Sequence, residues 1–270
     1  MAVVQFSNIP TKLITRIPTK YECLNEIYGG GLPVGMVSTW AGESGVGKTR
    51  LMLDLCAGLT NAGYRVLYSP NEMWPEQFKQ TAAPFNVKQD NFWVSQNAER
   101  DLEVVVNDIY QVKPDVVVID SLTMLEGFGG SGTLGVMDKF KHIANDIPCH
   151  IILFAQFTTD GKTVAGGAKA VYNADVVCKI HKRHPDESVT EKYGDGFFSI
   201  EVEKSRCGAS GGWVAFYHDR STKGIQYSTS SCDKVLIAIK QQIKEAKERR
   251  EEPVQEVPVK QGFWKRLLNV

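Results

Sequence analysis

A glycine-rich segment at residues 42–49 has the residue types and spacing of a phosphate-binding loop. It reads Gly-Glu-Ser-Gly-Val-Gly-Lys-Thr, which fits the pattern Gly-x4-Gly-Lys-Thr. Glycines let backbone N–H groups turn inward around phosphates, Lys48 can meet the β and γ oxygens, and Thr49 offers a hydroxyl to Mg²⁺. The residues predicted to bind ATP are Gly42, Glu43, Ser44, Gly45, Val46, Gly47, Lys48, Thr49 and Arg50.

Two acidic residues stand where phosphoryl transfer needs them. Asp120 ends an apolar run, and a carboxylate at the end of a central strand beside the loop suits Mg²⁺ and its waters. Glu72 follows the strand expected at residues 65–69, where it can position the attacking water. The simpler alternatives are that Asp120 caps the next segment and that Glu72 is a solvated surface residue. Their shared place at the carboxyl ends of neighbouring strands favours the catalytic interpretation.

The elements around these residues predict a parallel sheet with crossover helices. Strand-like and helix-like segments alternate from about residue 36 to 180. The expected strands of this part are residues 36–41, 65–69, 92–95, 115–120 and 150–155, and the expected helices are 48–59 and 102–112. Four further strands are expected at residues 175–180, 197–204, 213–218 and 225–228. The predicted fold class is α/β, with a central, mainly parallel sheet that ends in an antiparallel meander.

Composition changes near residue 233 and predicts three parts. Residues 1–232 form the core, residues 233–252 a helical extension with an apolar stripe, and residues 253–270 a linker with an amphipathic peptide. Hydrophobic content of 43% and charged content of 23% are ordinary for globular proteins.

Apolar runs, cysteines and net charge indicate where the protein is expected to act and what it can bind. No apolar run reaches the ~20 residues of a membrane span, and no secretory signal is visible, so we expect a cytoplasmic protein without a membrane span. The six cysteines are scattered, which argues against a zinc ribbon. Formal net charge is zero, so any nucleic-acid binding must depend on local sites.

Several segments together resemble the RadA/Sms proteins, the bacterial RecA-like ATPases of recombination and repair. In the order of that family come the phosphate loop and residues 16–19, 29–35, 66–72 and 113–121. Residues 159–166 look like the family's second loop, and Lys-Ser-Arg-Cys-Gly at residues 204–208 is similar to its Lys-Asn-Arg-Phe-Gly signature. The resemblance covers about residues 10 to 230 and implies a RecA-like P-loop NTPase core. The Lys-x-Arg-x-Gly segment is the discriminating one, since nucleotide motifs are common to RecA-type folds.

The resemblance implies roles for individual residues. Glu72 resembles the catalytic glutamate, and Gln156 occupies the position of a γ-phosphate sensor. Lys204 and Arg206 look like the pair that reaches the nucleotide of the neighbouring subunit in a ring, where added cations neutralise transition-state charge. The alternative is that Lys204 and Arg206 form the exposed face of an alternating strand.

Two loops correspond to those that face DNA in this family. Residues 126–133 are glycine-rich and expected to be mobile, with Phe128 available to stack on a base. Residues 157–170 contribute Lys162 and Lys169, which could grip the phosphates of single-stranded DNA. A surface loop without partners remains the alternative for both.

The predicted function is an ATP-dependent motor that acts on single-stranded DNA in recombination, repair or replication, as a homo-oligomeric ring, expected to be a hexamer. Two rivals stay open: a DnaB-type replicative helicase core, and a KaiC-like regulatory ATPase that binds protein rather than DNA. The family's four-cysteine zinc element and Lon-like domain have no counterpart in these residues, so their roles are not carried over.

The last residues predict a peptide that docks on a partner. Residues 253–259 contain two prolines and read as a spacer. The large apolar residues Phe263, Trp264, Leu267 and Leu268 then share one face of a short helix. The occupant expected is another subunit or a replication or repair protein; contact with a membrane surface and folding back on the core are the alternatives.

Overall fold

The computed structural model describes most of the predicted core. The described residues are 5–8, 13–97, 99–128, 132–157, 164, 173–182, 197–208, 213–219 and 226–227. Lys162, Lys169 and the predicted C-terminal parts at 233–252 and 253–270 lie outside these residues.

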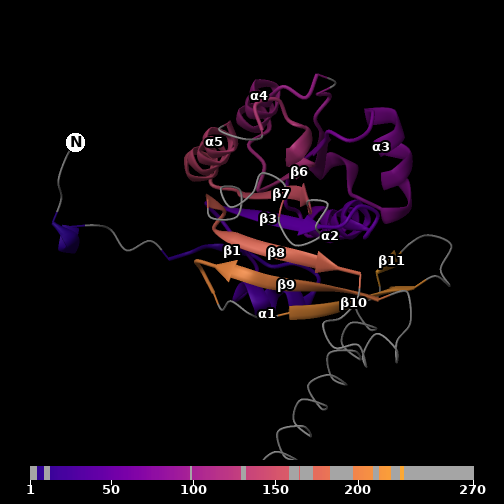
Figure 1. Cartoon of the computed structure of the whole chain (residues 1–270), viewed down its shortest axis with the longest axis horizontal. Helices are drawn as coiled ribbons and strands as arrows, with labels where there is room; N and C mark the ends of the chain where they lie inside the picture. Colours follow the sequence, from indigo (N-terminus) through magenta and orange to yellow (C-terminus); the bar gives the residue numbers. More distant parts are fainter. Residues whose placement is uncertain are drawn as a thin grey trace, which may run out of the picture.

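A nine-stranded sheet organises the chain, in the order β11-β10-β9-β8-β3-β7-β6-β4-β5 (Figure 1). Its parallel part consists of β3 (Met36–Gly42), β4 (Val66–Pro70), β5 (Phe92–Val94), β6 (Val116–Asp120), β7 (His150–Gln156) and β8 (Val176–His181). Its antiparallel part adds β9 (Phe197–Ser205), β10 (Trp213–Asp219) and β11 (Gln226–Tyr227). A separate pair joins β1 (Arg16–Ile17) to β2 (Leu32–Pro33). The predicted fold, parallel with an antiparallel end, is confirmed.

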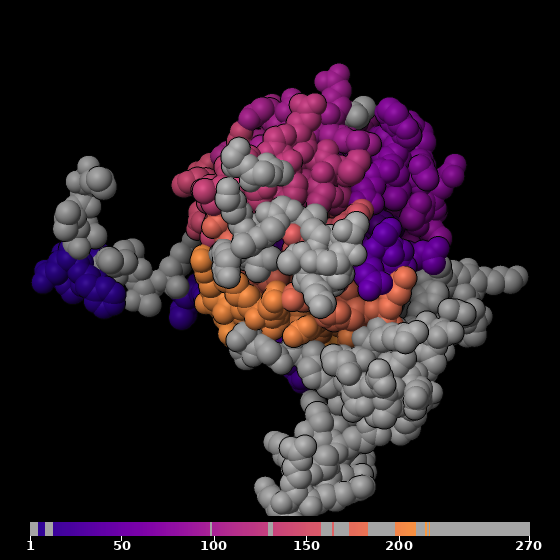
Figure 2. Space-filling view, viewed as in Figure 1, coloured from indigo at the N-terminus to yellow at the C-terminus, as the bar shows by residue number. Residues whose placement is uncertain are grey.

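Helices cover both faces of the sheet. On one face lie α1 (Glu22–Tyr28), α2 (Lys48–Asn61) and α3 (Pro75–Ala82), which share a hydrophobic cluster with Trp40, Tyr68 and Phe154. On the other lie α4 (Leu102–Val112) and α5 (Gly132–Asp146), whose cluster includes Leu67 and Leu153. Strand residues alternate between the two clusters because successive side chains point to opposite faces. In the space-filling view, residues from α2 to α5 form one continuous part of the surface beside β8 and β9 (Figure 2).

The sequence patterns located most elements to within two residues. The central strands are buried on both faces, as an apolar run such as Val-Val-Val-Ile in β6 requires. Helices α1, α3 and α5 were not predicted, and α5 takes in the last two residues of the glycine-rich segment at 126–133. Among the described residues, no helix is both long and apolar enough to cross a membrane.

Candidate nucleotide site

The phosphate loop joins the end of β3 to the first residue of α2. Gly45 and Gly47 adopt φ angles of +72° and +97°, a left-handed backbone region that glycine enters without steric cost. Gly42 has no room for a side chain, because a Cβ atom there would lie 2.9 Å from the Ile180 carbonyl oxygen. The loop therefore delivers its N–H groups and the positive end of α2 to one point at the carboxyl edge of the sheet.

Lys48 folds back over the loop. Its Nζ donates to the carbonyl oxygens of Gly42 and Glu43, both at 2.8 Å, and the residue is 8% exposed. Burial lowers the pKa of Lys48, while the nearby acids Asp120, Glu72 and Glu43 oppose that shift. Anionic phosphates would offer this ammonium group stronger acceptors than two neutral carbonyls.

Thr49 and Asp120 meet directly. The Thr49 hydroxyl donates to Asp120 Oδ2 at 2.7 Å, and Tyr68 donates its phenolic hydrogen to the same oxygen, also at 2.7 Å. Burial raises the pKa of Asp120, and the two hydrogen bonds counter that shift. A hydroxyl and a carboxylate in contact are hard oxygen ligands, so this pair fits an Mg²⁺ ion held between the loop and β6.

Glu72 and Gln156 complete the constellation on neighbouring parts of the sheet edge. Gln156 Nε2 donates to Glu72 Oε1 at 3.2 Å, and the backbone N–H of Glu72 donates to the Asp120 carbonyl oxygen at 3.2 Å. The sheet register explains the meeting, since Gly42 pairs with Gln156 and Pro70 pairs with Asp120. The structure thus brings Glu72, Gln156 and Asp120 together at the edge of the sheet that also carries the phosphate loop.

Tyr68 is a site residue that the sequence analysis missed. A periodicity signal was present: Tyr68 lies two residues before the end of β4, and Asp120 ends the paired strand β6. Side chains of the same parity on paired strands share a face of the sheet, so Tyr68 and Asp120 could have been placed together.

Lys204 and Arg206 lie at the opposite, amino edge of the parallel strands. Lys204 Nζ donates to the Ala174 carbonyl oxygen at 2.8 Å, and Arg206 Nη1 donates to Asp175 Oδ1 at 3.1 Å. Both partners precede β8, whereas the phosphate loop follows the carboxyl end of β3, the strand parallel to β8. Strand β9 ends at Ser205, so Arg206 lies one residue beyond it.

Of the residues predicted to bind DNA, only Phe128 is described. It is half-buried and packs against the cluster beneath α4 and α5, and its N–H donates to the Leu125 carbonyl oxygen at 3.2 Å. Its role in base stacking stays a prediction.

The sequence is similar to that of a known family of ATPases. A family model described as an AAA domain matches residues 5–161 of the 270-residue chain. The chain belongs to this AAA domain family.

Several relatives of this AAA domain protein carry the name DNA repair protein RadA. The Mycolicibacterium smegmatis protein is 28% identical over 64% of this chain and 39% of its own length. The Listeria monocytogenes protein is 38% identical over 43% of this chain and 25% of its own length. The Rickettsia prowazekii protein is 28% identical over 82% of this chain and 49% of its own length. The chain thus spans less than half the length of these relatives. Together with the family match, they identify it as a RadA/Sms-like, RecA-type ATPase core.

Proposed function

We propose that this ATPase core hydrolyses ATP at the interfaces of a ring of identical subunits and uses the turnover to act on single-stranded DNA. The observation that carries the proposal is the division of its catalytic residues between two edges of one sheet. Lys48, Thr49, Asp120, Glu72 and Gln156 gather at the carboxyl edge, and Lys204 and Arg206 lie at the amino edge.

The carboxyl-edge residues account for the chemical step. The loop and Lys48 bind the phosphates, and Thr49 with Asp120 would hold an Mg²⁺ ion that neutralises phosphate charge. Glu72 accepts a proton from water as the water oxygen attacks the γ-phosphorus and the bond to the ADP oxygen breaks. Gln156 donates a hydrogen bond to Glu72, which supports a role for its side chain in sensing the γ-phosphate.

The amino-edge pair supports assembly. Lys204 and Arg206 hydrogen-bond to residues that precede β8, on the far edge from the subunit's own loop. A head-to-tail contact between copies would bring the pair of one subunit to the loop of the next, and such contacts close into rings. Supplying cations in trans makes hydrolysis depend on subunit contact.

Action on DNA is supported by the relatives, which are named DNA repair proteins. It is a proposal because the chain spans only part of those proteins. A DnaB-type helicase core would share the same residues, and a KaiC-like regulatory ATPase would bind protein instead.

Mixing two inactive variants tests the ring. Lys48→Ala lacks the loop cation and Arg206→Ala lacks the in-trans cation, so each alone should hydrolyse ATP poorly. Mixed in equal parts, about a quarter of the interfaces in a random ring combine an intact loop with an intact Arg206, and turnover should return in proportion. No recovery on mixing would remove the in-trans assignment.

The DNA part is tested by the rate of wild-type ATP turnover with and without oligothymidylate. Stimulation supports a motor on single-stranded DNA. An unchanged rate, together with no binding of the oligonucleotide, would favour the regulatory ATPase.

A further inference from the structure

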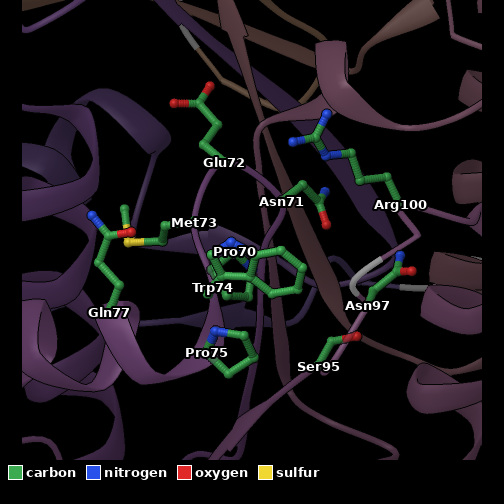
Figure 3. A pocket seen from close by; sticks show the side chains of 10 residues that line it. All are labelled: Pro70, Asn71, Glu72, Met73, Trp74, Pro75, Gln77, Ser95, Asn97 and Arg100. Atoms are coloured by element: carbon green, nitrogen blue, oxygen red, sulfur yellow. The ribbon is translucent and has the colours of Figure 1, made fainter.

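A hollow of about 260 Å³ opens beside Glu72, between the segments that follow β4 and β5. Its lining residues are Pro70, Asn71, Glu72, Met73, Trp74, Pro75, Gln77, Ser95, Asn97 and Arg100 (Figure 3). The lining carries one acidic and one basic side chain, and several neutral amides. The hollow is smaller than the ~300–1,000 Å³ of pockets that enclose drug-sized ligands, so it suits one flat ring system.

Trp74 is the large apolar group of this hollow. It is 65% exposed, whereas Trp40 in the core is fully buried. Its backbone is fixed, because it caps α3, is followed by Pro75 and accepts a hydrogen bond from the Phe78 N–H at 2.9 Å. In Figure 3, Trp74 lies in the middle of the lining, with Gln77 on one side and Asn97 on the other. An exposed indole on a held backbone, with polar side chains in the same lining, is an arrangement on which nucleobases stack.

Arg100 supplies the cation of the hollow. Its side chain is exposed, and within the described part of the chain its guanidinium has no hydrogen-bond or ion-pair partner. Its φ of +60° is uncommon for a residue other than glycine, and its N–H donates to the Asn97 carbonyl oxygen at 3.3 Å. Because its backbone is hydrogen-bonded and its guanidinium is exposed, Arg100 can pair with a phosphate.

The glycine-rich segment that carries Phe128 begins next to the residue that supplies the cation of the hollow. The Glu126 N–H donates to the carbonyl oxygen of Arg100 at 3.0 Å, which ties the start of that segment to the rim of the hollow. Glu126, two residues before Phe128, therefore lies next to Arg100.

We propose that this hollow binds one nucleotide of single-stranded DNA, with its base stacked on Trp74 and its phosphate paired with Arg100. The inference rests on the proposed function and names a contact for the DNA. The exposed Gln77 offers its amide group to the base edge, which an apolar protein anchor would leave unpaired, whereas the amides of Asn71 and Asn97 are bonded within the protein and shape the wall of the hollow. Glu72 lines this hollow and also belongs to the proposed hydrolytic site. DNA bound in the hollow would therefore lie beside the carboxylate proposed to activate the attacking water.

The test measures the affinity of the full chain for a labelled oligothymidylate by fluorescence anisotropy, without ATP. Trp74→Ala should weaken binding by roughly tenfold, the loss expected for one stacked base, and Trp74→Phe should retain most of the affinity. Arg100→Gln should weaken binding and reduce the salt dependence by about one released ion. Tyr110→Ala, an exposed aromatic at the opposite edge of the sheet, is the matched control and should bind as wild type.

The outcomes separate two failures. A wild-type protein that binds no oligothymidylate would remove the proposed function along with the contact. Wild-type binding that Trp74→Ala and Arg100→Gln leave intact would remove the hollow alone. Altered subunit assembly in these variants, measured by sedimentation with DNA affinity unchanged, would assign the hollow to a neighbouring subunit and overturn the inference.

Discussion

Arg206 and Asp175 form an ion pair, with Arg206 Nη1 3.1 Å from Asp175 Oδ1. The same oxygen lies 3.4 Å from Lys141 Nζ on α5. Asp175 is itself fixed to β3: its Oδ2 accepts the Val37 N–H at 3.0 Å, and its own N–H donates to the Val37 carbonyl oxygen at 2.8 Å. The pKa of Lys204 is lowered by burial and by its neighbours Arg206 and Lys141. Asp175 thus holds two of three gathered cations in place.

Asp175→Asn should reduce ATP turnover of the assembled protein by about tenfold, because Arg206 and Lys141 lose the charge that positions them. Nucleotide binding by the subunit's own loop should be unaffected. Mixing with Lys48→Ala should partly restore turnover, which a general loss of folding would not allow. Asp146→Asn, on the same edge of the sheet, serves as the control.

Lys141→Gln should also lower turnover in the ring, by a few-fold, if this ammonium group contributes to the cationic cluster. Lys139→Gln is the matched control, since Lys139 lies on the same helix and pairs with Glu103 instead. Steady-state kinetics would show the difference in kcat. Equal rates for the two variants would exclude Lys141 from catalysis.

Glu72→Gln should leave ATP binding intact and cut turnover by about 10²–10⁴-fold, because an amide cannot accept the proton of the attacking water. The amide oxygen can still accept the hydrogen bond from Gln156, so the local geometry survives. Single-turnover hydrolysis with nucleotide binding measured in parallel checks this. Glu76→Gln, an exposed residue on α3, should behave as wild type; retained turnover in Glu72→Gln would point to another base.

Tyr68→Phe should raise the pKa of Asp120 further, because the phenol hydrogen bond favours the ionised carboxylate. The acid limb of the pH–rate profile should then move to higher pH, because at a given pH fewer molecules have an ionised Asp120 carboxylate to bind the metal. Loss of ~1 kcal/mol of hydrogen bonding should raise the Mg²⁺ requirement roughly fivefold. Tyr64→Phe controls for the loss of a hydroxyl outside the site, and an unshifted profile in Tyr68→Phe would contradict the coupling.

His150 should make the fold less stable in mild acid. Its Nδ1 lies 2.8 Å from the Pro33 carbonyl oxygen and its Nε2 lies 2.8 Å from the Ser38 hydroxyl, which fits a neutral ring. Burial lowers the pKa of His150 to about 4, so the unfolded chain binds the proton more readily between that value and about 6.5. Stability contributed by the neutral ring is present above pH 6.5 and is lost as pH falls toward 4.

Urea unfolding at pH 7 and pH 5 measures this effect, and the wild type should lose about 2 kcal/mol over that interval. His150→Gln should show a smaller difference between the two pH values. His142→Gln, exposed on α5, should keep the wild-type difference. If His150→Gln does not fold, NMR titration of the wild-type imidazole tests the same claim.

Local patterns were sufficient for the parallel sheet and the phosphate loop. The loop has its own sequence signature, Asp120 ends an apolar strand, and Glu72 follows another, so both acids are marked by the pattern of the strands themselves. The meeting of Gln156 with Glu72 depends on strand order; the resemblance to a family indicated a role for each residue, but not their contact.

Other contacts had no local signal. The pairing of Arg206 with Asp175 joins residues on different elements, and the bond from Tyr68 to Asp120 depends on the register of β4 against β6. Helix α5 was missed because its first turn contains Gly132, and glycine weakens the helical pattern. The two contacts depend on which strands pair over long range, and local sequence propensity does not reveal that pairing.

The strand order also constrains when the nucleotide site can form during synthesis. Strand β3 is made early, yet its two neighbours in the sheet are β7 and β8, with Met36 paired to His150 and Ser38 to Val176. The ribosome must therefore synthesise most of the core before β3, the strand that leads into the phosphate loop, can pair with β7 or β8. Until then the loop lacks the rigid support that binding requires, so a nascent chain should gain affinity for ATP late and in a single step.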